Sequence, residues 1–274
     1  MIPTDREWND VTDITEYLTC PVCAGGVMYV DNEYRCQTCG AFCGAVHNGY
    51  VDTLIDGPTG KETGVTARMF RDARGSDRYQ LWIRCKVRLQ DLLHVRDQPM
   101  HLEDLVAGKS VLDVGCGPGV EVPTLERADV SSSFYLGVDH SGPFLSHASL
   151  LHQDSRHAYV RASATRLPFA SSSFDVVCAL FTLHHVEGDS NAPIAELART
   201  SRGDVFIADH VRSEQRLKGL FQTLYWRIFD GGINYLTMNE WESLFANHDL
   251  VIKEQQVSGL IFRHVVKFHL QRSL

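Results

Sequence analysis

Four cysteines near the start of the chain have the spacing of a metal site. They form two Cys-x2-Cys pairs, Cys20/Cys23 and Cys36/Cys39, with twelve residues between the pairs. Four thiolates spaced in this way can occupy the corners of a tetrahedron, which suits a closed structural zinc site. The segment between the pairs predicts a short hairpin that turns at residues 31–32. A module of this size buries too small a core, so the metal is expected to supply most of its folding free energy.

Other cysteines and one histidine leave the ligand set open. Cys43 and His47 lie just after the second pair, and either can replace one of the four cysteines. The simpler interpretation is that both are only neighbours of the site. Cys85, Cys116 and Cys178 have no partner at ligand spacing and are expected to be small core residues. A thioredoxin-like redox role for the pairs is disfavoured, because no βαβ pattern surrounds them.

A glycine-rich turn forms the second group of residues that point to chemistry. The sequence GCGPG at residues 115–119 follows an apolar run and precedes a helix-like stretch. Glycines at such a turn let backbone N–H groups approach a ligand closely. Asp113 stands two residues before the turn, and no Lys-Ser/Thr follows it as in a phosphate-binding loop. Asp139, about twenty residues later, ends the next apolar run, where an acidic side chain can accept hydrogen bonds from ribose hydroxyls.

A parallel sheet is needed to bring these residues to one edge. Apolar runs alternate with helical stretches, which predicts an α/β fold with a doubly wound, seven-stranded Rossmann-like sheet. Ligands of such a sheet bind at the carboxyl ends of its strands. The predicted strands cover residues 111–114, 134–139, 157–162, 173–181, 203–209, 249–257 and 260–270.

Turn residues and uneven charge divide the chain into parts. A cluster of turn residues at 56–60 predicts a boundary, so a zinc-ribbon module is expected over residues 1–56. A helical linker or lid is expected over 57–105, and the main domain over 106–274, with a lid insertion at about 211–247.

The chain carries a net charge of −8, which argues against a nucleic-acid footprint over the whole molecule. Residues 1–60 have two basic and nine acidic side chains, a net charge of −7, whereas residues 61–100 have a net charge of +4. No apolar run reaches about 18 residues, so no membrane span is expected. The acidic N-terminus lacks a secretory pattern, so a cytoplasmic location is the expectation.

Three motifs together resemble the class I S-adenosylmethionine-dependent methyltransferases, in particular their ubiquinone-type (type 11) branch. The motifs VLDVGCGPG, LGVD and LPFASSSFDVVCALFTLHHV occur in that order, and the resemblance covers about residues 105–270. It implies that Asp139 holds the cofactor ribose. It also implies that the turn lines the methionine end of the cofactor, through Asp113, Gly115, Gly117 and Gly119.

The same resemblance implies the remaining cofactor contacts. Ser163 and Ala164 are expected beside the adenine, and the backbone around Leu180 and Phe181 is expected to close the pocket. Many relatives have Asp where this chain has Ser163, so the contact to the adenine amino group is expected to be weaker or made by backbone.

A second resemblance, to the ribosomal-RNA guanine methyltransferases, covers the first hundred residues and one motif of the main domain. It rests on the zinc ribbon, GYVDTL at 49–54, an arginine-containing helix near residues 68–74, and RASATRLPF at 161–169. Those enzymes also carry an N-terminal zinc module and a serine at the place of Ser163. The resemblance implies that Tyr79 caps the cofactor. The stretch that characterises the family after the fourth strand is absent, and TLHH stands there instead.

Three histidines are candidates for acid–base chemistry. Methyl transfer needs an aligned nucleophile, exclusion of water and sometimes a base. His184 and His185 follow the fourth predicted strand, where an acceptor should approach, and His210 follows the fifth. The alternative is that the His184/His185 pair is structural.

An apolar stripe at helical spacing runs through residues 217–228. It is either core packing or part of an acceptor lid, in which Tyr225, Trp226 and Phe229 line an apolar pocket.

Three functions follow as hypotheses. The first is an S-adenosylmethionine-dependent methyltransferase for a small-molecule acceptor such as a secondary metabolite. In it, a zinc ribbon acts as a structural cap or as the contact of a homodimer. The second is an RNA base (guanine) methyltransferase, which the acidic charge disfavours. The third is a catalytically inactive zinc-ribbon binding protein. The expected cofactors are S-adenosylmethionine and structural Zn²⁺.

Overall fold

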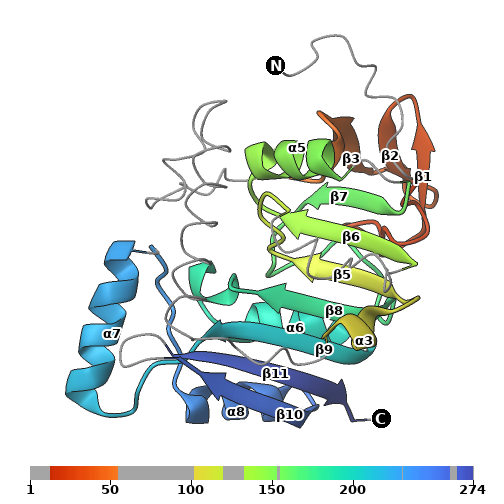
Figure 1. Ribbon diagram of the computed structural model, residues 1–274. Coiled ribbons are helices and arrows are strands. Elements are labelled where there is room, and N and C mark those ends of the chain that lie inside the picture. Colours follow the sequence, from red (N-terminus) through yellow and green to blue (C-terminus); the bar gives the residue numbers. More distant parts are fainter. Residues whose placement is uncertain are drawn as a thin grey trace.

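Among the residues that the structure describes, eleven strands form one continuous mixed sheet in the computed structural model (Figure 1). The structure describes residues 13–54, 102–119, 133–152, 155–229, 231–259 and 264–273. The sheet order is β1-β2-β3-β4-β7-β6-β5-β8-β9-β11-β10. The strands are β1 (Val27–Val30), β2 (Glu33–Cys36), β3 (Phe42–His47), β4 (Tyr50–Asp52), β5 (Ser110–Val114), β6 (Phe134–Asp139), β7 (His157–Arg161), β8 (Phe174–Leu180), β9 (Ser201–His210), β10 (Leu250–Ser258) and β11 (Val265–Arg272).

The seven strands from β5 to β11 confirm the predicted α/β sheet. Neighbours among β7, β6, β5, β8 and β9 are parallel, whereas β11 pairs antiparallel with β9 and β10 pairs antiparallel with β11. The carboxyl ends of the five parallel strands therefore meet at one edge of the sheet. The described helices are α3 (Leu102–Val106), α5 (Gly142–Leu151), α6 (Asn191–Thr200), α7 (Arg216–Phe229) and α8 (Met238–Asn247), with a 3-10 turn η1 (Leu183–His185).

Both faces of the sheet are buried, because its parallel strands are apolar on both sides. In β8, Val176 and Cys178 join the same buried cluster as residues of α3 and α5, whereas Val177 and Ala179 face the cluster that contains α6 and α8. The start of α8 carries the capping box expected from its sequence: Thr237 Oγ1 accepts from the Glu240 N–H, and the Glu240 carboxylate accepts from the Thr237 N–H.

The N-terminal strands extend the main sheet and share its core. The β1–β2 hairpin turns at residues 31–32 as predicted, and both residues there have positive φ, as a type I′ turn requires. Strand β4 pairs in parallel with β7, with Val51 opposite Val160. Tyr17 stacks between Phe134 and Phe174, at centroid distances of 4.7 and 4.9 Å. The zinc-ribbon module expected over residues 1–56 is thus joined to the main domain by a strand pair and by ring contacts.

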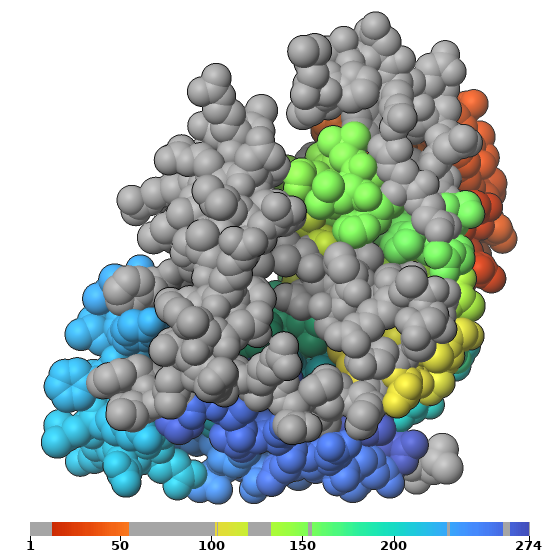
Figure 2. Space-filling view, viewed as in Figure 1, coloured from red at the N-terminus to blue at the C-terminus, as the bar shows by residue number. Residues whose placement is uncertain are grey.

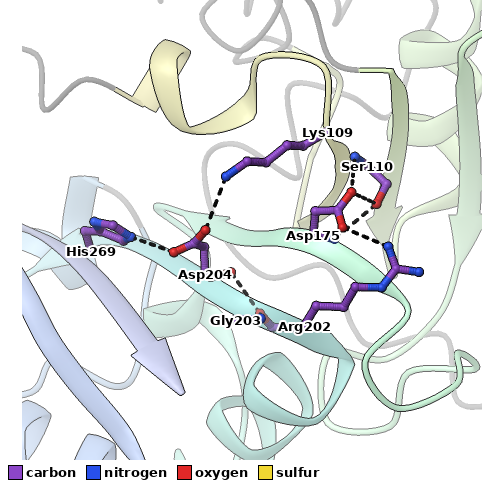
Figure 3. Close-up of polar contacts among 8 residues, drawn as sticks. Lys109, Ser110, Asp175, Arg202, Gly203, Asp204 and His269 are labelled. Atoms are coloured by element: carbon purple, nitrogen blue, oxygen red, sulfur yellow. Dashed lines mark hydrogen bonds and ion pairs between the residues drawn. The ribbon is translucent and has the colours of Figure 1, made fainter. Parts of the chain in front are cut away.

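A polar network ties the amino ends of the central strands together, at the sheet edge opposite the carboxyl ends (Figure 3). The Asp175 carboxylate accepts from the Ser110 N–H at 2.9 Å, from the Ser110 hydroxyl at 2.7 Å and from Arg202 at 2.8 Å. These donors hold the pKa of Asp175 below its usual value, although burial alone would raise it. Asp204 lies 3.0 Å from Nε2 of His269 and so joins β9 to β11. The network therefore holds the strands together at their amino ends. The carboxyl ends, at the opposite edge of the sheet, remain available for the site.

Several predictions fall outside the described residues. These are the helix expected after the glycine turn, Tyr79, Cys85 and most of the linker over 57–105. In the part of the chain that the structure describes, no helix has the length and apolarity needed to cross a bilayer.

Candidate functional site

The glycine turn after β5 is held tightly against the neighbouring strands. Gly115, Gly117 and Gly119 all have positive φ, which side chains other than glycine rarely adopt. The N–H of Gly115 donates to the carbonyl of Val138 at 2.7 Å, so the turn lies against the end of β6. A Cβ atom added at Gly115 would lie 1.9 Å from Oγ1 of Thr182, the second residue after β8. The turn therefore needs glycine at Gly115 both for conformation and for space.

Asp139 ends β6 and its carboxylate reaches the glycine turn. Its Oδ2 atom accepts from the Gly117 N–H at 3.0 Å, and its Oδ1 atom accepts from the Ser141 N–H at 2.8 Å. Burial raises the pKa of this carboxyl, although His140 and the backbone donors act in the opposite direction. A carboxylate has about four acceptor positions, so Asp139 keeps capacity for further donors such as ribose hydroxyls. The structure thus brings together the glycine turn and Asp139, which were predicted separately.

Asp113 occupies the fourth position of β5 and is buried. Its Oδ2 atom accepts a hydrogen bond from the Tyr135 hydroxyl at 2.8 Å. Burial and this carboxylate raise the pKa of Tyr135 well above its usual value, so the phenol keeps its proton and remains a donor. This contact joins Asp113 to β6, and its predicted role at the methionine end of the cofactor stays a prediction.

The loop after β7 and the end of β8 complete this edge. Ser163 Oγ lies 2.8 Å from Oγ1 of Thr165, and the Arg166 N–H donates to the Ser163 carbonyl at 3.0 Å. Ser163 and Ala164 are half-buried in this turn. After Leu180, Phe181 has a φ of 53° and is 40% exposed. A left-handed conformation is uncommon for phenylalanine, and such conformations are concentrated at functional sites.

A buried histidine–carboxylate pair lies at the ends of β8 and β9. Nδ1 of His184 lies 2.5 Å from Oδ1 of Asp209, and the backbone N–H of His184 donates to the other carboxylate oxygen at 3.2 Å. Burial alone would raise the pKa of Asp209, but His184 and His210 together outweigh that effect, and the pKa lies below its usual value. Asp209 is therefore ionised at neutral pH, and it orients the His184 ring with Nε2 on the opposite side.

Aromatic rings surround this pair. His210 stacks on Trp226 with 4.9 Å between ring centroids, and His184 stacks on Tyr235 at 5.5 Å. Trp226 and Tyr235 also contact each other, at 4.8 Å. The ring of His185 lies 4.1 Å from that of His184. The three candidate histidines therefore form one cluster with an aromatic wall. Sequence reasoning missed Asp209 and Tyr235, and the signal for Asp209 was its place at the carboxyl end of β9.

Helix α7 supplies Trp226 but leaves most of its apolar stripe outside the core. Gln222 and Trp226 are buried on one face of the helix. Figures 1 and 2 place the helix at the periphery of the molecule. The core-packing interpretation of the stripe is wrong for its exposed members, because an apolar periodicity does not show which face of the helix packs against the core. The exposed members are Leu217, Leu220, Phe221, Leu224, Tyr225 and Ile228.

The four predicted cysteines converge on one point in the N-terminal module. Their sulfur atoms all lie within 4.8 Å of one another, with separations of 3.5 Å for Cys23–Cys36 and 3.6 Å for Cys20–Cys39. Tetrahedral zinc with Zn–S bonds of 2.3 Å needs sulfurs about 3.8 Å apart, so the four residues fit this metal. The backbone N–H groups of Cys39 and Thr38 point at Cys36 Sγ and lower the pKa of Cys36 to about 6.

The two alternative ligands lie outside this group. The Cys43 thiol donates to the Ala41 carbonyl at 3.4 Å, and burial raises its pKa to about 12, so it stays a neutral thiol. Nε2 of His47 lies 3.1 Å from the Asn48 side chain, and its ring contacts Tyr50. Among the described residues, the group with metal-binding geometry is Cys20, Cys23, Cys36 and Cys39.

Comparison with known proteins bears on the segment that carries the glycine turn and Asp139. Residues 112–208 match a family described as a methyltransferase domain. The match begins in β5 and ends in β9, so it includes the turn, Asp139 and His184 but stops one residue before Asp209.

Two curated relatives and one solved structure are similar to parts of this chain. An uncharacterized methyltransferase of Mycolicibacterium vanbaalenii is 38% identical over 80 residues, which cover 29% of this chain and 30% of that protein. The demethylmenaquinone methyltransferase of Tropheryma whipplei is 31% identical over 140 residues, 51% of this chain and 54% of that protein. The chain therefore spans about half or less of these relatives' length.

A crystal structure of a putative methyltransferase from Bacillus halodurans has a TM-score of 0.55 at 13% identity. The similarity covers 68% of this chain and all of that one. This likeness confirms the fold.

Proposed function

We propose that the chain is an S-adenosylmethionine-dependent methyltransferase that acts on a small-molecule acceptor. The observation that carries the proposal is the contact between Asp139 and the Gly117 N–H in a matched methyltransferase domain. This contact places the carboxylate that can bind a ribose next to a glycine turn whose backbone a ligand can approach closely, both at the same edge of the sheet. In this proposal the turn lines the methionine end, Ser163 and Ala164 border the adenine, and the Leu180–Phe181 backbone closes the pocket.

The cofactor supplies an electrophilic methyl group on a sulfonium, and its leaving group is neutral. The work left to the protein is to align the acceptor, exclude water and, where the nucleophile carries a proton, remove it. Nε2 of His184 is suited to accept that proton, because Asp209 holds Nδ1 and stabilises the charged ring that results. His185 and His210 lie in the same cluster and are the next candidates.

The aromatic wall favours an apolar or aromatic acceptor. Trp226 and Tyr235 are buried and pack against His210 and His184, so the surroundings of the histidines are aromatic and apolar. Such surroundings favour an apolar or aromatic acceptor over a charged one. The name of the Tropheryma relative, a demethylmenaquinone methyltransferase, agrees with an acceptor of this class. We further propose that Cys20, Cys23, Cys36 and Cys39 hold a structural zinc ion.

Calorimetric titration with S-adenosylhomocysteine tests cofactor binding. We expect one site per chain, and at least a tenfold weaker dissociation constant for Asp139→Ala. The matched control is Glu254→Ala, which removes an exposed carboxylate on the edge strand β10. Absence of binding to the wild-type protein refutes the proposal and favours the inactive binding protein.

A methyl-transfer assay tests the acceptor class. Tritiated S-adenosylmethionine is incubated with a panel of small aromatic phenols and quinols, and in parallel with total RNA. Label in the aromatic panel that is lost in Asp209→Asn supports the proposal. Label only in RNA overturns the small-molecule acceptor and favours the RNA base methyltransferase.

A further inference from the structure

The first Cys-x2-Cys pair contacts the loop that follows β7. Nη2 of Arg166 donates to the carbonyl of Pro21 at 2.9 Å, and Pro21 lies between Cys20 and Cys23. Arg166 is three residues after Ser163 and closes its turn through the hydrogen bond from its N–H to the Ser163 carbonyl. One arginine therefore spans from a metal-ligand turn to the loop expected beside the adenine.

A short strand-like pairing fixes the far end of the same loop. Leu18 forms an antiparallel bridge with Phe169, and both side chains are buried. The Thr19 N–H, next to Cys20, donates to the Pro168 carbonyl at 2.9 Å. The Ala170 N–H donates to the Tyr17 carbonyl at 3.2 Å. Residues 166–170 are thus held by residues 17–21, the segment that leads into the cysteine site.

Strand β4 holds the start of the loop from the edge of the sheet. Asp52 and Arg161 form an ion pair at 3.0 Å with little exposure of either side chain. The Thr53 hydroxyl donates to the Arg161 carbonyl at 2.7 Å, and Nε of Arg161 donates to the His140 carbonyl at 2.9 Å. His140 directly follows Asp139. The N-terminal module therefore contacts the backbone next to the proposed ribose acceptor as well.

The position of these contacts depends on the cysteine site. Cys20 and Cys36 are buried, whereas Cys23 and Cys39 are exposed, so on the outer side the two turns meet through sulfur atoms 3.5 Å apart. Metal binding at such a site contributes free energy to the local fold around its ligands. Loss of the metal is then expected to release Pro21 and residues 17–19 from the loop.

We propose that metal at the four-cysteine site sets the affinity of the cofactor site. The metal does so by positioning residues 163–170 through the contacts of Pro21, Leu18 and Thr19. Arg166 is a positioning residue in this arrangement. The inference rests on the proposed function, and it assigns the N-terminal module a role within the same site.

The experiment compares zinc-loaded protein with protein stripped by a chelator and dialysed. Hydrogen exchange is read along the chain, and S-adenosylhomocysteine affinity is measured by calorimetry. We expect stripping to speed amide exchange in residues 17–19 and 163–170, to leave β5, β8 and β9 protected, and to weaken S-adenosylhomocysteine binding at least tenfold. Re-addition of zinc should restore both readouts.

Arg166→Met separates positioning from general stability, with Arg35→Met as the matched control. Arg35 is an exposed arginine in the same module that pairs with Glu33 in its own strand. We expect Arg166→Met to keep its zinc and its unfolding midpoint, and to bind S-adenosylhomocysteine about threefold more weakly, the cost of one exposed hydrogen bond from a charged donor. Arg35→Met should bind as the wild type does.

Two outcomes overturn the proposal. One is unchanged S-adenosylhomocysteine affinity in zinc-free protein. The other is unchanged exchange of residues 163–170 after zinc is lost. If the zinc-loaded wild type binds no S-adenosylhomocysteine, the proposed function fails, whereas the exchange measurement still decides whether the metal positions the loop. If stripping unfolds the whole chain, the comparison of Arg166→Met with Arg35→Met decides, and equal affinities refute the role of Arg166.

Discussion

The substitution Gly115→Ala tests whether the glycine turn is packed as tightly as its geometry indicates. Gly115 has a φ of 79°, and an added Cβ would lie 1.9 Å from Thr182 Oγ1 and 2.4 Å from Thr182 Cβ. The left-handed conformation costs alanine about 1–2 kcal/mol. Overpacking against Thr182 is expected to cost about 1–3 kcal/mol more. Together these effects lower the free energy of unfolding by about 2–5 kcal/mol.

Gly108→Ala is the matched control for this substitution. Gly108 has a similar φ of 65°, but nothing lies within 4 Å of the Cβ position. It should therefore cost only the backbone contribution, about 1–2 kcal/mol. Urea unfolding of both variants measures the difference. Adding Thr182→Ala to Gly115→Ala should recover part of the loss, since it removes Oγ1 and Cγ2 but leaves Cβ. Equal destabilisation by Gly115→Ala and Gly108→Ala would refute the tight contact.

Three further substitutions have expected outcomes. Asp139→Ala should weaken S-adenosylhomocysteine binding at least tenfold, or about 1.4 kcal/mol. Because burial raises the pKa of Asp139, wild-type affinity should also fall on acidification, beginning above the usual carboxyl range, whereas Asp139→Ala should lack this dependence. Asp209→Asn should lower the methyl-transfer rate constant without changing cofactor affinity, and a parallel loss of affinity would contradict its assignment to the acceptor side. Asp175→Asn should lower the free energy of unfolding at pH 7. Because the folded-state pKa of Asp175 is lowered, that difference is complete above the unfolded pKa of about 3.9 and should shrink as pH falls through the folded pKa. A pH-independent difference in urea unfolding would refute this origin.

The sequence predicted the strands of the main sheet well. Strand β6 begins and ends at the predicted residues, and β8 differs from its prediction by one residue at each end. Strands that are buried on both faces appear as continuous apolar runs, which makes them easy to recognise. The cysteine site was also predictable, because four ligands in two short turns are local in sequence.

Features that depend on long-range pairing were not predictable. Strand β4 has three residues, too few to show a periodicity, and its partner Arg161 is 109 residues away from Asp52. Asp209 stands at the carboxyl end of β9, but only the parallel pairing of β8 with β9 places it beside His184. The stripe on α7 identified an amphipathic helix, but periodicity does not show what covers the apolar face, and Gln222 is buried instead.

The pairing of β4 with β7 also closes an edge of the parallel sheet. The backbone N–H and C=O groups of Val160 and Arg161 face β4. Strands β3, β2 and β1 follow β4 in the sheet, so β1 is the edge strand on this side. A chain shortened to begin after residue 54 would leave that side of β7 bare. Bare strands of this kind recruit other chains. The shortened protein should therefore associate with itself, so the main domain cannot be studied in isolation simply by removing the cysteine-bearing N-terminal residues.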